Sequence, residues 1–117
     1  MEEMTKNLEK EVISYIANFD LVQLKEFYDQ HQHFNWKFTD NKGNNLLHFL
    51  FKKYENIPIS MIQFLLECHI DSLGVNESFE TPYEMAKNHQ NMIAVALFNR
   101  KIYEIKKEYE NFLANQN

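Results

Sequence analysis

The architecture of this chain depends most on residues 40–50, which read DNKGNNLLHFL. Asp40 can open a tight turn, and the glycine three residues later accepts a positive φ at little steric cost. Asn45 directly precedes an apolar run and is a residue type that caps the free amides at the start of a helix. The stretch therefore predicts a tight loop that leads into a short helix over residues 46–53.

The same succession returns 36 positions later, where residues 76–86 read NESFETPYEMA. Thr81 supplies a hydroxyl cap, and Pro82 suits the first helical position because its missing N–H costs nothing there. Between the two stretches, residues 65–71 read LLECHID. A loop and a helix start that recur in this way predict an array of repeated units.

Apolar residues recur every three or four positions through the rest of the chain, which is the spacing of amphipathic helices. Asp20 and Gln23 form a capping-box pattern, and Pro58 suits the first turn of a helix. The chain has only 2 Gly and 2 Pro, which argues against β-sandwiches and barrels. Six helices in three pairs are expected, over residues 5–18, 21–29, 46–53, from 58 onward, 82–88 and from 91 onward.

Residues 40–50 resemble the ankyrin pattern of Asp, two variable residues, Gly, one variable residue, Thr-Pro-Leu-His, one variable residue and Ala. Residues 76–86 repeat this pattern, and LLECHID at 65–71 is similar to the family's Leu-Leu-Glu, one variable residue and Gly-Ala-Asp. Residues 20–28, DLVQLKEFY, look like the second helix of a first repeat, with His33-Phe34-Asn35 in place of Gly-Ala-Asp.

The resemblance implies an all-α fold, an ankyrin-like solenoid of three helical hairpins with a longer C-terminal helix that caps the stack. Beyond Phe98 that helix could instead dock a partner helix or self-associate, and a generic array of helical hairpins is the nearest alternative fold. It covers nearly the whole chain, which is expected to form a single domain over residues 1–117 with approximate repeats 5–38, 39–74 and 75–113.

The chain departs from the family pattern in its period and in its glycines. The family period is 33, and the three extra residues of the middle unit are expected between Lys53 and Pro58, where a surface loop absorbs them at small cost. Five further departures concern residue type: Phe79 replaces the turn glycine, Leu46 the proline and Glu84 the histidine, and His33 and His69 stand where glycine follows the second helix.

The charge of the chain restricts its partners. With 12 basic and 17 acidic residues the formal net charge is −5, so the chain lacks the clustered cations that bind nucleic acid, and among proteins a basic partner is one option. The single Cys68 fits a reducing compartment, and the polar start does not resemble a secretory signal. No apolar stretch approaches the roughly 20 residues of a membrane helix. We expect a cytoplasmic chain that is monomeric when unbound and does not engage a membrane.

No catalytic or cofactor motif stands out in the sequence. The five histidines and Cys68 are spread over the three repeats, without the closed set of four ligands that a structural zinc site needs, so no metal or cofactor is expected. Cys68 and His69 are neighbours on a helix end and point in different directions, so Cys68 is interpreted as a small buried hydrophobe. There is no phosphate-binding glycine loop. We expect no enzyme; a metal-dependent enzyme stays a further alternative that would require a bound metal in the purified protein.

Repeat stacks leave a continuous concave face, and the loop tips and first helices of each pair present side chains on it. Trp36 is expected in the core, whereas Phe38 is a candidate for either core or contact. The candidate partner-binding residues are Phe38, Asn41, Lys42, Asn44, Lys52 and Lys53 in the middle unit, and Glu77, Ser78, Phe79, Glu80, Asn88 and His89 in the third.

The expected function is therefore that of a protein-binding module. An acidic, compact single domain suits an inhibitor or immunity protein that neutralises a basic partner protein. It equally suits an adaptor or effector scaffold that recruits a host protein, and the sequence leaves both open.

Overall fold

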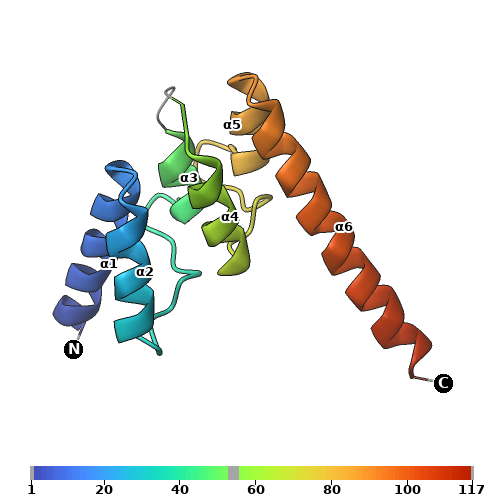
Figure 1. Ribbon diagram of the computed structural model, residues 1–117, viewed down its shortest axis with the longest axis horizontal. Helices are drawn as coiled ribbons and strands as arrows, with labels where there is room; N and C mark the ends of the chain where they lie inside the picture. Colours follow the sequence, from blue (N-terminus) through green and yellow to red (C-terminus); the bar gives the residue numbers. More distant parts are fainter. Residues whose placement is uncertain (1, 53–55, 117) are drawn as a thin grey trace.

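The computed structural model describes residues 2–52 and 56–116, and over these ranges the chain is all-helical, with no strand. The described residues form six helices that follow one another in three pairs. Figure 1 shows the last helix extending well beyond the others. Their bounds are α1 Glu2–Ala17, α2 Leu21–Gln30, α3 Leu46–Phe51, α4 Ile59–Glu67, α5 Pro82–Asn88 and α6 Met92–Ala114. The all-α class and the six predicted helices are confirmed, with ends that differ by a few residues. Lys53 lies outside the described residues.

Polar side chains begin most of these helices, as the sequence predicts. The Asn45 side chain accepts hydrogen bonds from two amides of α3, and the Thr81 hydroxyl accepts one from the Glu84 amide. The capping box predicted for Asp20 and Gln23 is only half right. The Asp20 side chain accepts the Gln23 amide hydrogen, but the Asp20 amide donates to the Tyr15 carbonyl of the preceding helix and not to the Gln23 side chain.

Pro58 was expected in the first turn of its helix and instead occupies the N-cap position. Its ψ of 130° is extended, and α4 starts one residue later, at Ile59. No side-chain hydrogen bond caps this helix. Proline suits either place because it has no N–H to leave unsatisfied.

Three helices end in the same way, with one residue in the left-handed region. Phe19, His69 and Gln90 have φ of 52°, 62° and 58°. The residue that follows each of them donates its amide hydrogen five positions back, as in the bond from Asn91 to the Ala86 carbonyl at 2.9 Å. This bond satisfies a carbonyl that the end of a helix leaves open. His69 thus takes the glycine-like conformation expected from its place in the pattern, whereas His33 does not have a positive φ.

The helices lie in two layers. In the first layer α3 packs between α1 and α5, and in the second layer α4 packs against α6. Side chains connect α2 to α4, since the rings of Tyr28 and Phe64 have centroids 5.7 Å apart. Each helix pair therefore contacts its neighbour along the chain.

The helix spacing bears on the three extra residues of the middle unit, which the sequence predicts between Lys53 and Pro58; residues 53–55 of that stretch lie outside the described part of the chain. The second helices α4 and α6 start 33 positions apart, at Ile59 and Met92, whereas the first helices α3 and α5 start 36 apart, at Leu46 and Pro82. The excess therefore lies between the start of α3 and the start of α4, and the helices on either side keep their packing.

The core runs through all three helix pairs, and the first long loop adds an aromatic cluster to it. Trp36 is buried among the rings of Phe27, Phe34 and Phe64, each with a centroid within 6 Å of the indole, which confirms its expected place. Phe38 is also buried, at 7% exposure, and packs edge-on against Phe34. Its place among the candidate contact residues is therefore wrong. Alternate residues of the loop point inward, and Phe38, two positions after Trp36, therefore faces the core as Trp36 does.

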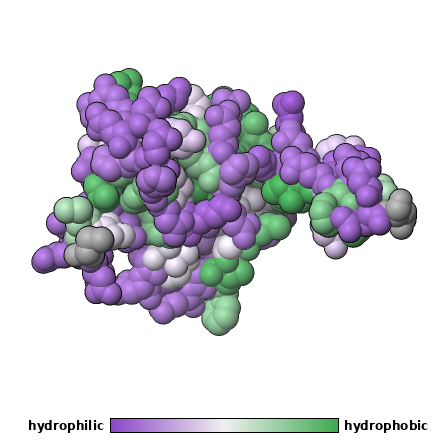
Figure 2. Space-filling model, turned by 90° about the horizontal axis from the view of Figure 1, so that it is seen from below, coloured by the Kyte–Doolittle hydropathy of each residue, from purple (hydrophilic) through white to green (hydrophobic). Residues whose placement is uncertain are grey.

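The last helix caps the stack with its first half only. Ala94, Val95 and Phe98 are buried, and Phe98 contacts the rings of Phe51 and Tyr83. From Tyr103 to the last described residue every side chain is exposed. Figure 2, seen from below, shows this part of the helix standing apart from the body at one side. The expectation that the whole helix covers the end of the stack is wrong for its second half.

Within the described residues, no helix combines the length and the apolar character needed to cross a bilayer.

Candidate protein-binding surface

The loop before α3 forms a tight turn around the carboxylate of Asp40. Its Oδ1 accepts hydrogen bonds from the amides of Lys42 at 2.9 Å and Asn44 at 2.8 Å, and the Gly43 amide donates to the Asp40 carbonyl. Burial alone would raise the pKa of this carboxyl. The hydrogen bonds from Asn44 and Lys42, together with the positive charge of Lys52, outweigh burial and hold the pKa below its usual value.

The loop before α5 repeats this turn 36 positions later. Oδ1 of Asn76 accepts from the amides of Ser78 at 3.0 Å and Glu80 at 2.9 Å, and the Phe79 amide donates to the Asn76 carbonyl. Phe79 has φ of 60° and corresponds to Gly43, with φ of 79°. An aromatic residue therefore adopts a backbone conformation that ordinarily favours glycine.

The two turns lie side by side and are joined by hydrogen bonds. The Glu77 amide donates to the Lys42 carbonyl at 2.9 Å, and the Asn76 side-chain amide donates to Oδ1 of Asn44 at 2.8 Å. Asn44 is only 3% exposed, so its expected place on the contact surface is wrong. Its amide is buried between the turns, where it holds them together.

His48 fastens the start of α3 to the following unit. Its Nδ1 accepts the Asn45 amide hydrogen at 3.0 Å, so its Nε2 carries the proton and donates to the Glu80 carbonyl at 2.9 Å. The Asn45 side chain extends in the same direction and donates to the Asp71 carbonyl at 2.8 Å. These bonds hold the loop before α5 against the second helix pair, and so they fix the positions of the two loop tips.

Six of the predicted contact residues lie exposed at the two adjoining loop tips or directly beside them: Asn41, Lys42, Glu77, Ser78, Phe79 and Glu80. Lys52 and Asn88 are exposed at the ends of α3 and α5, and His89 is half-buried. Phe79 is the most exposed large hydrophobic side chain of the described residues, at 89%.

A groove of about 390 Å³ lies between α3 and α5 and collects four of the predicted residues. It is lined by Phe51, Lys52, Glu80, Met85, Asn88 and His89. The loop tips and the two first helices therefore form one surface, which we call the inner surface: the six tip residues together with the lining of this groove.

Phe51 and Met85 line the groove and Phe49 lies beside it under Lys52, although none of the three was predicted as a contact residue. The sequence carries a signal for Phe49 and Met85. Phe49 is half-buried on α3 with the Lys52 ammonium 4.6 Å from its ring centre, a cation–π contact that holds Lys52 over the helix. Met85 lines the groove from α5. Both stand at the variable position between His and Ala of the ankyrin pattern, and that position is the signal by which the sequence could have indicated them.

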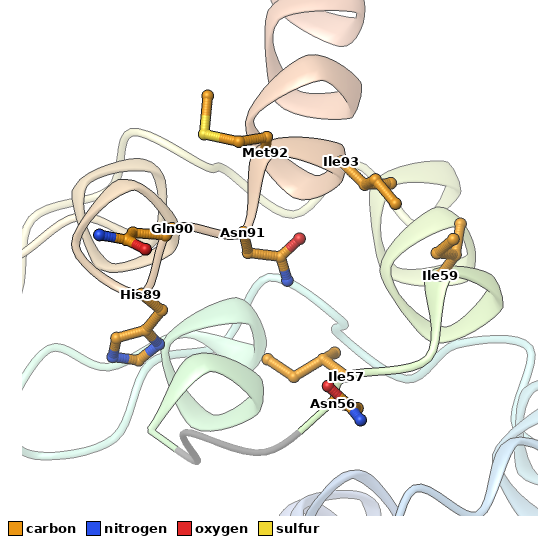
Figure 3. Close-up of a pocket in the computed structure, with 8 residues that line it drawn as sticks. All are labelled: Asn56, Ile57, Ile59, His89, Gln90, Asn91, Met92 and Ile93. Atoms are coloured by element: carbon orange, nitrogen blue, oxygen red, sulfur yellow. The ribbon is translucent and has the colours of Figure 1, made fainter.

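A second cleft, of about 490 Å³, lies where the connection before α4 approaches the turn between α5 and α6. Figure 3 shows Asn56 and Ile57 on one side and His89 to Asn91 on the other, with Met92 pointing away from them. The Asn91 side chain caps α6 by accepting the Ala94 amide hydrogen. Among the described residues of the chain, those that line the cleft include no carboxylate or lysine, and they offer shape and amide groups for contact.

In the described part of the chain, no three His, Cys, Asp or Glu residues gather in a way that could hold a metal ion. Cys68 is partly buried. Burial, helped by the negative charge of Glu67, raises the pKa of its thiol to about 12. A thiol that stays protonated at neutral pH is a poor nucleophile.

No protein-family model matches this chain, and no curated protein or solved structure matches it. The described residues define the chain as an all-helical protein of paired helices joined by stacked loops.

Proposed function

We propose that this chain is a protein-binding module of the ankyrin-repeat type that acts through its inner surface. One observation carries the proposal: two turns with the same hydrogen bonds recur 36 positions apart and stack on one another, Glu77 donating to Lys42. Stacked loops of this kind place their tips in a row beside the first helices, which is the geometry with which repeat proteins contact a macromolecule.

Phe79 is the proposed anchor of the contact. In the preceding turn, a Cβ on Gly43 would lie 3.2 Å from the backbone of Asn76 and crowd the next turn. Phe79 belongs to the second of the two stacked turns, and its side chain extends into solvent. The left-handed conformation costs a non-glycine residue about 1 kcal/mol or more. An exposed ring makes few packing contacts that would offset this loss of stability. A binding role accounts for a phenylalanine in this place.

The carboxylates beside Phe79 indicate the chemistry of the partner. Glu77 and Glu80 are exposed and lie two positions before and one position after Phe79 in the chain, which as a whole carries a charge of −5. An apolar pocket rimmed by basic groups would complement this tip. The finer proposal is an inhibitor or immunity protein that neutralises such a basic partner by binding, without catalysis. The adaptor is its alternative, and a neighbouring gene for a toxin or one tight co-purifying partner would favour the inhibitor.

Affinity capture from cells of the native organism tests the proposal. The wild-type chain is compared with Phe79→Ser and with Val22→Ser, a matched control that is also exposed and apolar but lies on α2 in the other layer. We expect one stoichiometric partner that the Phe79 variant loses and the Val22 variant retains. Equal capture by the three chains would place the contact elsewhere, and capture of nothing would contradict the binding module.

A further inference from the structure

The second half of α6 carries an apolar stripe that the other described residues do not cover. Val95 and Phe98 are buried within the stack, and the same alternation of three and four positions continues beyond it. Its members are Ile102, which is half-buried, and Ile105, Tyr109 and Phe112, which are 55 to 62% exposed. The stripe that packs α6 onto the body therefore extends into solvent as positions a and d of a heptad.

This part of the helix has little to stabilise it alone. The 12 residues from Tyr103 to Ala114 span about 18 Å, shorter than isolated helices that persist in water. The ion pairs along it, Arg100 with Glu104 at 3.5 Å and Lys107 with Glu110 at 4.0 Å, are solvent-exposed and contribute little. A second helix that covers the stripe would stabilise the extension.

We propose that a second copy of this chain covers the stripe, with the two α6 extensions paired antiparallel. The stripe is self-complementary in that orientation, because its two aliphatic residues come first and its two aromatic residues come last. Ile102 then faces Phe112 of the second copy, and Ile105 faces Tyr109 of the second copy. Every layer combines one large and one smaller side chain, which fills a helix–helix seam without voids or crowding.

A parallel pair would lose this match. It would set Tyr109 against Tyr109 and Phe112 against Phe112, with isoleucine on isoleucine in the other two layers. It would also bring Lys101 and Lys106 of opposite copies together, since these residues hold the g and e positions. The antiparallel arrangement keeps the two bodies at opposite ends. The helix ends at Ala114, two residues beyond Phe112, so its tip need not run into the other body.

The area available predicts a weak, reversible dimer. Four half-exposed side chains, with the stems of the flanking lysines, bury roughly 500 Å² per copy, or about 1,000 Å² in total, which is the lower limit of a specific interface. Lys106 faces Lys106 of the second copy, and Glu108 faces Glu108, which weakens the pair further. A dissociation constant of roughly ten to several hundred micromolar follows. The monomer expected from the sequence would then be the dilute form.

Sedimentation equilibrium on the full chain, up to about 1 mM, tests the pairing. We expect a monomer–dimer equilibrium that Tyr109→Glu weakens at least about tenfold. Tyr103→Glu is the matched control, because Tyr103 is 59% exposed on the opposite side of the same helix, against 62% for Tyr109. A monomer at all concentrations would overturn the proposal, as would equal effects of the two substitutions.

The orientation is tested with Lys106→Glu. In an antiparallel pair this variant alone gains nothing, because glutamate then faces glutamate, whereas an equimolar mixture with the wild type should associate roughly two- to fivefold more tightly than either chain. In a parallel pair, position 106 faces Lys101, and the variant alone would associate more tightly. That result would refute the antiparallel arrangement. The test does not depend on the inner surface, so it can fail while the proposed binding module stands.

Discussion

Replacing His48 with alanine should destabilise this protein far more than any exposed substitution, because His48 is a buried link between the second and third units. Its ring is fully buried and bonds the Asn45 amide at 3.0 Å and the Glu80 carbonyl at 2.9 Å. Alanine leaves both groups without that partner. Leaving the buried Asn45 amide without a hydrogen bond lowers the free energy of unfolding by about 1–3 kcal/mol. The Glu80 carbonyl contributes less to the loss, because water can reach it. With the small cavity left by the ring, we expect a loss of about 3 kcal/mol.

Urea unfolding followed by circular dichroism measures this loss, with Glu84→Ala as the matched control. Glu84 occupies the same position of α5 that His48 occupies in α3, but its side chain is exposed, so its replacement should change stability by less than about 0.5 kcal/mol. The loss of stability of His48→Gln should fall between those of the two alanine variants. The side-chain oxygen of glutamine can accept the Asn45 amide hydrogen, but the glutamine side chain does not have the shape of the imidazole ring. A loss below about 1 kcal/mol for His48→Ala, or equal losses for the two alanine variants, would refute the linking role.

Three further outcomes are expected. The folded state holds the pKa of Asp40 below its unfolded value, so the resulting stability is present above about pH 4 and is lost as the pH falls through the folded pKa; Asp40→Asn keeps the turn, as Asn76 does in the next loop, and the wild type and variant should converge in urea unfolding at acid pH. Native Cys68 should react with iodoacetamide at pH 8 at least about a hundredfold more slowly than the unfolded chain, and equal rates would contradict its raised pKa. Phe38→Ala should cost about 3–4 kcal/mol in thermal unfolding and Phe79→Ala about 0.5 kcal/mol or less, and a reversed order would contradict the burial of these rings.

The loops show how far local sequence predicts the candidate site. Asp40 and Asn76 open their turns through bonds to amides two and four residues on, which are local interactions that residue type and spacing indicate directly. Phe38 and Asn44 were misplaced because their burial depends on neighbours distant in sequence. The Asn44 amide becomes interior only when Asn76, 32 residues later, stacks on it.

The last helix also shows what local sequence does not predict. The apolar spacing from Val95 to Phe112 predicts one long amphipathic helix, and the structure has it. Periodicity states which face is apolar but not what lies opposite that face. The expectation that α6 covers the end of the stack is wrong from Tyr103 onward, because the stack that α6 covers is shorter than the helix itself.

By itself, the sequence determined the helices, most of their caps and the 36-residue recurrence, because each of these follows from interactions within a few positions of the chain. Only the tertiary structure decided which loop side chains face solvent, how the turns at Asp40 and Asn76 join, and that half of α6 projects from the body. Those features depend on the packing of units far apart in sequence, and burial is a property of the assembled surface rather than of any single segment.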